Sequence, residues 1–264
     1  MLGFKNMKIN KIIIIYSLTA ASIILFLFVH VMNTGLIFIG NSVYNALPVS
    51  NDAKTFFTGV VQQAIQALLA LIIGLVILKK PLRDLGITTK NAKQSIQYFG
   101  IFALSWTIIT VLYCVISYFF IPSYWQSMTS VPSPSGSKVF YTLLFQLVFP
   151  GIGEELLFRP AFIAILAAVL QRVEKNSNTS VSEKLKHIVF SLITALLFAT
   201  AHIYFSTSPF KITHIDPLQQ VIALTCGFFY AMTYQKTRSL LAPFLCHNFA
   251  NTITSLCVWI VPLL

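Results

Sequence analysis

The sequence predicts an all-α, polytopic membrane protein with about seven transmembrane helices and the N-terminus inside. Three observations support this fold class. Of the 264 residues, 56% are hydrophobic and 9% are charged, whereas a soluble domain carries about 25% charged residues. Seven apolar segments are long enough to cross about 30 Å of hydrocarbon as helices. The Lys and Arg residues gather in alternate loops, which is typical of a chain that crosses the membrane repeatedly.

The seven predicted spans follow one another with polar loops between them. The first span follows three lysines and is longer than the apolar region of about 7–15 residues in a signal peptide, so we expect it to remain uncleaved. The fourth would be about 50 Å long as one straight helix, and Pro150, Gly151 and Gly153 can kink it. The spans are 12–39, 56–78, 97–121, 139–171, 188–205, 217–235 and 239–262.

The distribution of the 18 Lys and Arg residues sets the predicted orientation. With the N-terminus inside, fourteen lie in cytoplasmic segments, while Lys54, Lys138 and Lys211 lie outside and Arg159 lies within a span. The net charge of +11 is therefore explained by topology. Nucleic acid is not an expected partner, because no basic stripe is interleaved with aromatic residues. The expected surroundings are the lipid bilayer of an integral membrane protein.

A Pro- and Ser-rich segment, "PSYWQSMTSVPSPSGSK" (122–138), divides the chain. Its prolines break regular structure, so we predict a flexible outer loop. Residues 1–138 then form an N-terminal unit of three spans and this loop. Residues 139–262 form a core of four spans, and this core holds the ionisable groups that need an explanation.

The segment "GIGEELLFRP" (151–160) places three ionisable side chains inside an apolar span. Each costs about 2.5–3.5 kcal/mol at the centre of a transmembrane helix when it has no partner. Glu155 and Arg159 are four residues apart on the helix and can neutralise each other. Glu154 is not needed for that pair. We therefore expect Glu154 to face other polar groups inside the bundle.

Two later spans supply such polar groups. His202 lies in "FATAH", and His247 and Asn251 share one helix face in "HNFAN". Converging with Glu154, these side chains form a set that suits amide hydrolysis. A carboxylate and an imidazole can deprotonate water directly or through a metal, and a second histidine and an asparagine can donate to an oxyanion. Taken singly, each residue can also serve only packing or helix association.

Three short motifs in this order resemble those of the CPBP family, the CAAX proteases and their bacteriocin-processing or Abi relatives. The family pattern of EExxxR, FxxxH and HxxxN/D appears here as "EELLFR" (154–159), "FATAH" (198–202) and "HNFAN" (247–251). The resemblance covers roughly 139–262. One departure is Pro160, where family members usually have glycine, and a proline there removes a helical hydrogen bond.

The resemblance implies an intramembrane endopeptidase that cuts a peptide or a membrane-associated protein. Glu154 would be the general base and His202 would hold the water or a metal. His247 and Asn251 would stabilise the oxyanion or complete a ligand set, and Glu155 and Arg159 would support the site. A divalent metal such as zinc, if the enzyme uses one, would be bound by Glu154, His202 and His247.

Two other hypotheses remain at this stage. The first is a non-catalytic bacteriocin-immunity or scaffold protein that keeps the same fold and polar pocket. The second is a proton-coupled transporter, which the absence of an inverted repeat in the sequence disfavours. The Lys-, Asn- and Ile-rich composition points to a bacterial plasma membrane.

Overall fold

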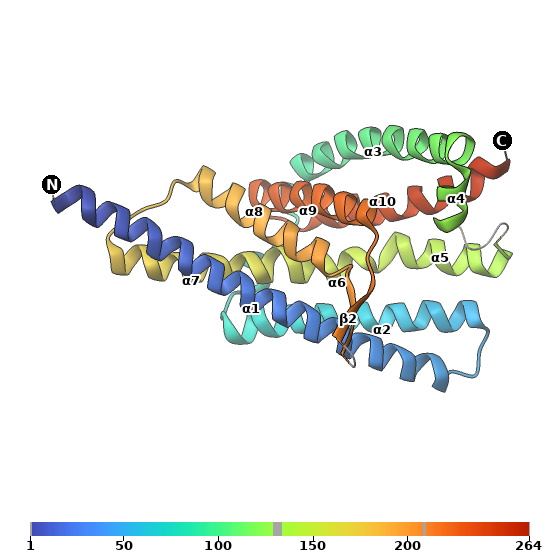
Figure 1. The fold of residues 1–264 in the computed structure, drawn as a ribbon, viewed down its shortest axis with the longest axis horizontal. Coiled ribbons are helices and arrows are strands. Elements are labelled where there is room, and N and C mark those ends of the chain that lie inside the picture. The colour runs from blue at the N-terminus through green and yellow to red at the C-terminus, as the bar shows by residue number, and fades with distance from the viewer. Residues whose placement is uncertain (1, 129–133, 208–209, 264) are drawn as a thin grey trace.

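The computed structural model describes residues 2–128, 134–207 and 210–263. They form an elongated helix bundle with its termini at opposite ends and one short hairpin at mid-length (Figure 1). The longer helices are α1 (Leu2–Ala46), α2 (Asn51–Leu71), α3 (Ala92–Phe120), α5 (Gly136–Val148), α6 (Pro150–Leu156), α7 (Phe162–Ser177), α8 (Glu183–Thr200), α9 (Pro217–Thr237) and α10 (Leu241–Ile260). Shorter elements are α4 (Pro122–Met128), η1 (Ile72–Ile77), η2 (Leu82–Leu85), η3 (Leu157–Ala161), η4 (Val261–Leu263), β1 (Tyr204–Thr207) and β2 (Phe210–His214).

The helical character and the membrane class of the sequence prediction are confirmed. In the described part of the chain, five helical stretches are long and apolar enough to cross a membrane. Helices α8 and α9, which match the other two predicted spans, are not among them; α8 has three charged residues in its first four positions. The five stretches are Lys11–Ala46, Asn51–Ile77, Ala92–Phe120, Gly136–Ser177 and Leu241–Leu263.

The long fourth segment is one helical stretch with two local irregularities, as its glycines and prolines suggested. Helix α5 ends at Val148, and Pro150 occupies the first turn of α6, where its missing N–H costs little. The second irregularity is the π-helical turn η3, which contains Pro160. The wider turn keeps the chain helical past this proline, because the N–H of Phe162 reaches the carbonyl of Leu157. Pro160 therefore does not break the helix.

Two short predictions about local structure were wrong. The span predicted over 188–205 ends earlier, because α8 stops at Thr200 and an antiparallel hairpin of β1 and β2 follows. The Asn33 side chain of α1 donates to the carbonyl of Ala201 at 2.8 Å and so binds a backbone group that the helix has left free. The predicted flexible loop 122–138 begins with the helix α4, while 129–133 lie outside the described residues.

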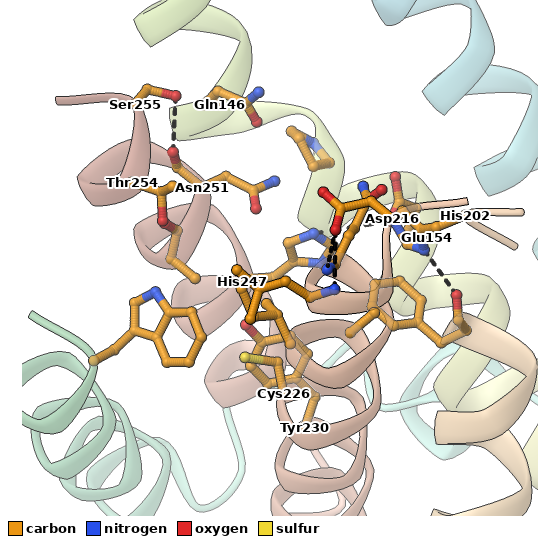
Figure 2. A pocket seen from close by; sticks show the side chains of 18 of the residues that line it. Gln146, Glu154, His202, Asp216, Cys226, Tyr230, His247, Asn251, Thr254 and Ser255 are labelled. Carbon is orange, nitrogen blue, oxygen red and sulfur yellow. Dashed lines mark hydrogen bonds and ion pairs between the residues drawn. The ribbon is translucent and has the colours of Figure 1, made fainter. Parts of the chain in front are cut away.

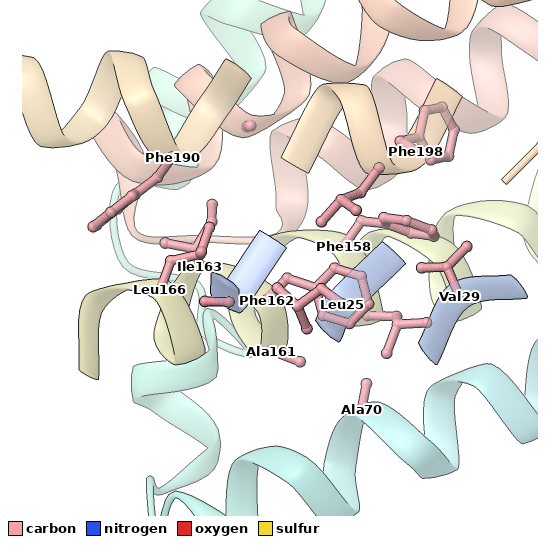
Figure 3. Packing of buried hydrophobic residues seen from close by; sticks show 14 of the residues in the cluster. Leu25, Val29, Ala70, Phe158, Ala161, Phe162, Ile163, Leu166, Phe190 and Phe198 are labelled. Atoms are coloured by element: carbon pink, nitrogen blue, oxygen red, sulfur yellow. The ribbon is translucent and has the colours of Figure 1, made fainter. Parts of the chain in front are cut away.

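The main hydrophobic core surrounds η3 and α7 (Figure 3). Phe158 and Phe162 meet edge to face, with ring centroids 5.2 Å apart. Helices α1, α2 and α8 cover this pair from different sides. The core therefore fixes the segment that carries Glu154, Glu155 and Arg159. Its other buried members include Leu25, Val29, Ala70, Ala161, Ile163, Leu166, Phe190 and Phe198.

Helices α2 and α6 approach closely at Gly153. A methyl group added there would lie 2.6 Å from the backbone carbonyl oxygen of Gln63, and would also collide with the Gln63 side chain. Small residues allow such close packing between membrane helices. Gly153 therefore sets the distance between α2 and the helix that carries the two glutamates.

We expect Gly153→Ala to lower the free energy of unfolding by about 1–3 kcal/mol, because the backbone of α2 must move away. Gly100→Ala on α3 is the matched control, since nothing lies within 4 Å of the added methyl there. Its effect should stay within about 0.5 kcal/mol. Unfolding in detergent measures both variants, and equal stability of the two would contradict the close-packing argument.

Candidate functional site

The centre of the site is a buried ion pair between Glu155 and Arg159. Both side chains are fully buried. The Arg159 Nε donates to Glu155 Oε2 at 2.7 Å, and Nη2 donates to Oε1 at 3.1 Å. The Arg159 guanidinium also lies over the rings of Phe198 and Tyr230, 5.1 and 5.7 Å from their centroids. The predicted pair is present, and its second hydrogen bond and the two rings hold the guanidinium in one orientation.

His247 lies between the two glutamates. Its Nδ1 is 2.9 Å from Glu155 Oε1, and its Nε2 is 3.8 Å from Glu154 Oε2. Tyr230 stacks on the imidazole with centroids 5.6 Å apart. Because carboxylates only accept hydrogen bonds, Nδ1 carries a proton that it donates to Glu155, and this hydrogen bond directs Nε2 toward Glu154. We expected Glu155 to neutralise Arg159 and to support the site, and the structure adds this contact with His247.

Glu154 is held by a residue from the N-terminal half of the chain. Gln63 of α2 donates its amide Nε2 to Glu154 Oε1 at 2.8 Å. The Glu154 side chain keeps 19% of its surface exposed, whereas Glu155 has none. One oxygen of Glu154 is thus bound by Gln63 while the other faces His247. The two adjacent glutamates therefore differ, since Glu154 is partly exposed and Glu155 is fully buried.

His202 is fixed from within its own segment. Its Nδ1 is 2.9 Å from the backbone carbonyl oxygen of Phe198, so this nitrogen carries the proton and Nε2 has the free lone pair. The Phe198 ring packs edge to face on His202, at 5.1 Å between centroids, and on His247 at 5.7 Å. Phe198 thereby links the two histidines. Phe198 also forms part of the cavity wall.

Glu154, His202, His247 and Asn251 all line one cavity of about 550 Å³. Figure 2 shows them around this space with Asp216, Tyr230 and Ser255. Asn251 lies one turn beyond His247 on α10, as the spacing in the sequence indicated. A second cavity of about 160 Å³ lies beside α1 and α2 and shares the side chains of Glu154 and His202. The three predicted helices thus meet around a common space.

Three contributing residues were not found from the sequence. Gln63 reads as an ordinary polar residue of a span, and Tyr230 as an aromatic one. Asn248, next to His247, accepts from the Gly151 N–H at 2.8 Å and donates to the Val148 carbonyl at 3.3 Å. It thereby satisfies backbone groups at the α5–α6 break and ties α10 to that break. None of these contacts leaves a local pattern in the sequence.

The suggested metal ligands do not form a metal site as they are arranged. Among the described residues, no three His, Cys, Asp or Glu side chains are placed to hold one ion. The Nδ1 atoms of His202 and His247 both hydrogen-bond to oxygen atoms, which leaves the two Nε2 atoms as the nitrogens available to other groups. We therefore derive the chemistry of the site from the side chains and water alone.

Residues 136–253 match the family described as Rce1-like, type II CAAX prenyl endopeptidase. This part of the chain is therefore similar to the CAAX protease (CPBP) family. The match includes every predicted site residue and confirms the resemblance seen in the three motifs. Gln63 lies outside it. No curated protein and no solved structure matches the chain.

We expect Arg159→Met to lower the free energy of unfolding by about 3–5 kcal/mol, because it leaves the Glu155 carboxylate buried without its cation. The matched variant is Arg159→Met combined with Glu155→Gln, which removes both charges and keeps an acceptor for His247. It should recover more than half of the lost stability. Unfolding in detergent distinguishes the two, and a single variant as stable as the wild type would show that the ion pair is not needed.

Proposed function

We propose that the chain is an intramembrane endopeptidase in which Glu154 activates a water molecule to hydrolyse a peptide bond. The observation that carries this proposal is the placement of Glu154 and His247 on one cavity wall, with Nε2 and Oε2 3.8 Å apart. The family, which is one of proteases acting on membrane-associated proteins, supports it. The substrate is a peptide or membrane-anchored protein, and the bilayer is a bacterial plasma membrane.

The first step is the attack of water on the scissile carbonyl carbon. The water is held between the free Oε2 of Glu154 and the Nε2 lone pair of His202, which both line the cavity. Glu154 takes a proton from the water as the new C–O bond forms. The carboxylate can do this because Gln63 occupies only its other oxygen.

The second step is the collapse of the tetrahedral intermediate. In its imidazolium form His247 carries a proton on Nε2 as well as on Nδ1, and this Nε2–H and the Asn251 amide donate to the oxyanion, which lies in the cavity beside both. Glu155 keeps the imidazole in this orientation through Nδ1. The carbonyl re-forms as the C–N bond breaks, and Glu154 returns its proton to the leaving amine. No atom outside the substrate, the water and these side chains is required.

The transmembrane arrangement in this proposal has seven helices and the N-terminus inside. Helices α8 and α9 complete the bundle around the site. Their lower hydropathy is compatible with contacts to other parts of the protein on several sides. The division of fourteen against three Lys and Arg residues supports the orientation. Residues 1–138 would be the supporting unit and 139–262 the catalytic core.

We expect Glu154→Gln to lower kcat by at least about 10²-fold while the protein still folds and inserts, because the amide cannot take a proton from water. Glu183→Gln is the matched control, since the Glu183 side chain is 72% exposed on the first turn of α8. Mass spectrometry of peptides incubated with purified protein, with and without chelator, measures cleavage. Full activity of the Glu154→Gln variant would refute the role of Glu154. A wild type that cleaves no peptide would favour the immunity or scaffold hypothesis.

We expect Gln63→Met to lower kcat by about 10- to 100-fold with KM changed less than about twofold, because a misplaced base affects the chemical step. Methionine has similar length but no donor for Glu154. The control is Gln66→Met, one turn along α2, whose amide oxygen has no hydrogen-bond partner. If both variants lose activity equally, the loss reflects α2 packing and the hydrogen bond to Glu154 has no separate role.

A further inference from the structure

Two amide side chains of the N-terminal helices have a free oxygen beside the candidate site. Asn33 of α1 donates its Nδ2 to the carbonyl oxygen of Ala201 at 2.8 Å, and Gln62 of α2 donates its Nε2 to the carbonyl oxygen of Leu36 at 3.1 Å. Each of these contacts uses only the amide nitrogen. Neither amide oxygen has a hydrogen bond within the described part of the chain, so each remains an acceptor for a further group.

Both amide side chains line the smaller cavity, which lies beside α1 and α2 and has a volume of about 160 Å³. Gln63, Glu154 and His202 line it as well. Polar cavities in proteins hold ordered water when each molecule finds about two to four polar partners, whereas apolar cavities stay dry. This cavity offers amide, carboxylate and imidazole groups. Its lining therefore favours a small cluster of water molecules over an apolar ligand.

Glu154 and His202 form the boundary between the smaller cavity and the larger one. Among the residues that the structure describes, they are the two that line both spaces. His247 and Asn251, which donate to the oxyanion in the proposed mechanism, line only the larger of these two cavities. The pair that holds and deprotonates the water is thus accessible from both cavities, while the groups that meet the substrate oxygen are accessible from one. This division corresponds to the two reactants, water and peptide.

A hydrolase inside an apolar bundle needs a source of water. Each turnover consumes one water molecule, and the hydrocarbon around the helices supplies none. A polypeptide that occupies the larger cavity, of about 550 Å³, displaces water from it. The smaller cavity lies outside that volume. Water stored there can therefore reach Glu154 and His202 while the peptide is bound.

The hairpin after α8 places polar groups next to the smaller cavity. Tyr204 of β1 lines the cavity and pairs with His214 of β2. Lys211, Thr213 and His214 are exposed on β2. A charged side chain is costly where it faces hydrocarbon, so we expect this part of the surface to meet water. The hairpin therefore connects the cavity to a hydrated surface from which it can refill.

We propose that the cavity beside α1 and α2 is a water site that supplies the hydrolytic water to Glu154 and His202, separately from the cavity that holds the peptide. Asn33 and Gln62 bind the stored water through their amide oxygens. One molecule moves between the Glu154 carboxylate and the His202 Nε2, gives a proton to Glu154 and forms the new C–O bond. The use of this water rests on the proposed function, whereas the presence of water in the cavity does not, so the two are tested separately.

The first experiment detects water in the smaller cavity without any substrate. Brief X-ray irradiation of the purified protein produces hydroxyl radicals from bound water, and mass spectrometry of peptides locates the side chains that they oxidise. Leu36 and Leu25 are a matched pair on α1, because their exposed fractions are 5% and 4% and Leu36, unlike Leu25, lines the cavity. We expect Leu36 to be oxidised at least about twofold faster, since only Leu36 adjoins a polar cavity that holds water. Equal oxidation of the two leucines would overturn the water site.

The second experiment fills the smaller cavity. Leu36→Phe adds a larger side chain to its wall, and Val31→Phe on the same helix is the control, because Val31 is 73% exposed. We expect Leu36→Phe to lower kcat by at least about tenfold with KM changed less than about twofold, because the peptide cavity is unaltered and only the chemical step lacks water. Val31→Phe should match the wild type. A folded Leu36→Phe variant with wild-type kcat would overturn the supply of water from this cavity.

Gln62→Leu links the two measurements and decides the question if Leu36→Phe does not fold. It replaces a water acceptor by an apolar side chain and keeps Leu36 as the reporter. We expect oxidation of Leu36 to fall toward that of Leu25 and kcat to fall in the same variant, whose fold is checked by its unfolding transition in detergent. Lower oxidation of Leu36 with an unchanged kcat would overturn the supply role. If the wild type cuts no peptide while Leu36 is oxidised faster than Leu25, the proposed protease function fails and the water site stands.

Discussion

The ion pair between Glu155 and Arg159 is the interaction on which the rest of the site depends. Two charges without any exposed surface are stable in an apolar bundle only when each has its partner and its hydrogen bonds. The guanidinium makes two hydrogen bonds to Glu155 and lies over two aromatic faces, while its Nη1 has no hydrogen-bond partner among the described residues. Glu155 Oε1 also accepts a hydrogen bond from His247 Nδ1 and thereby orients this imidazole. One pair thus neutralises a buried charge and also fixes the position of the His247 imidazole in the candidate site.

The second glutamate acquires a different role from its surroundings. Glu154 and Glu155 are adjacent in the chain, yet one is fully buried and the other lines the cavity. Gln63 of helix α2 binds one oxygen of Glu154 and leaves the other oxygen free. The close approach at Gly153 is what brings α2 within reach. The N-terminal spans, which lie outside the family match, therefore contribute directly to the candidate site.

The packing around this ion pair also makes the two sides of the site different, because one side is a closed core and the other is a cavity. The aromatic core below the ion pair closes the site toward the Lys- and Arg-rich loops, while the cavity continues between α3, α5, α9 and α10. Charge in the loops and closure in the core are independent features of the chain.

The sequence by itself determined the membrane class, the order of the helices and the residues of the candidate site. Membrane helices must satisfy their backbone internally, so apolar length predicts them well, and ionisable groups in lipid are too costly to occur without a role. The sequence did not reveal the hairpin after His202, the second partner of Glu155, or Gln63, Asn248 and Tyr230. These depend on contacts between residues far apart in the chain, such as Gln63 and Glu154, which leave no periodic pattern. The spacing from Arg159 had already indicated that Glu154 is the glutamate that faces the other polar groups. The tertiary structure alone decided that His247 lies between both glutamates, because a helix fixes only the angle between neighbouring side chains, and the packing of other helices decides what each of them meets.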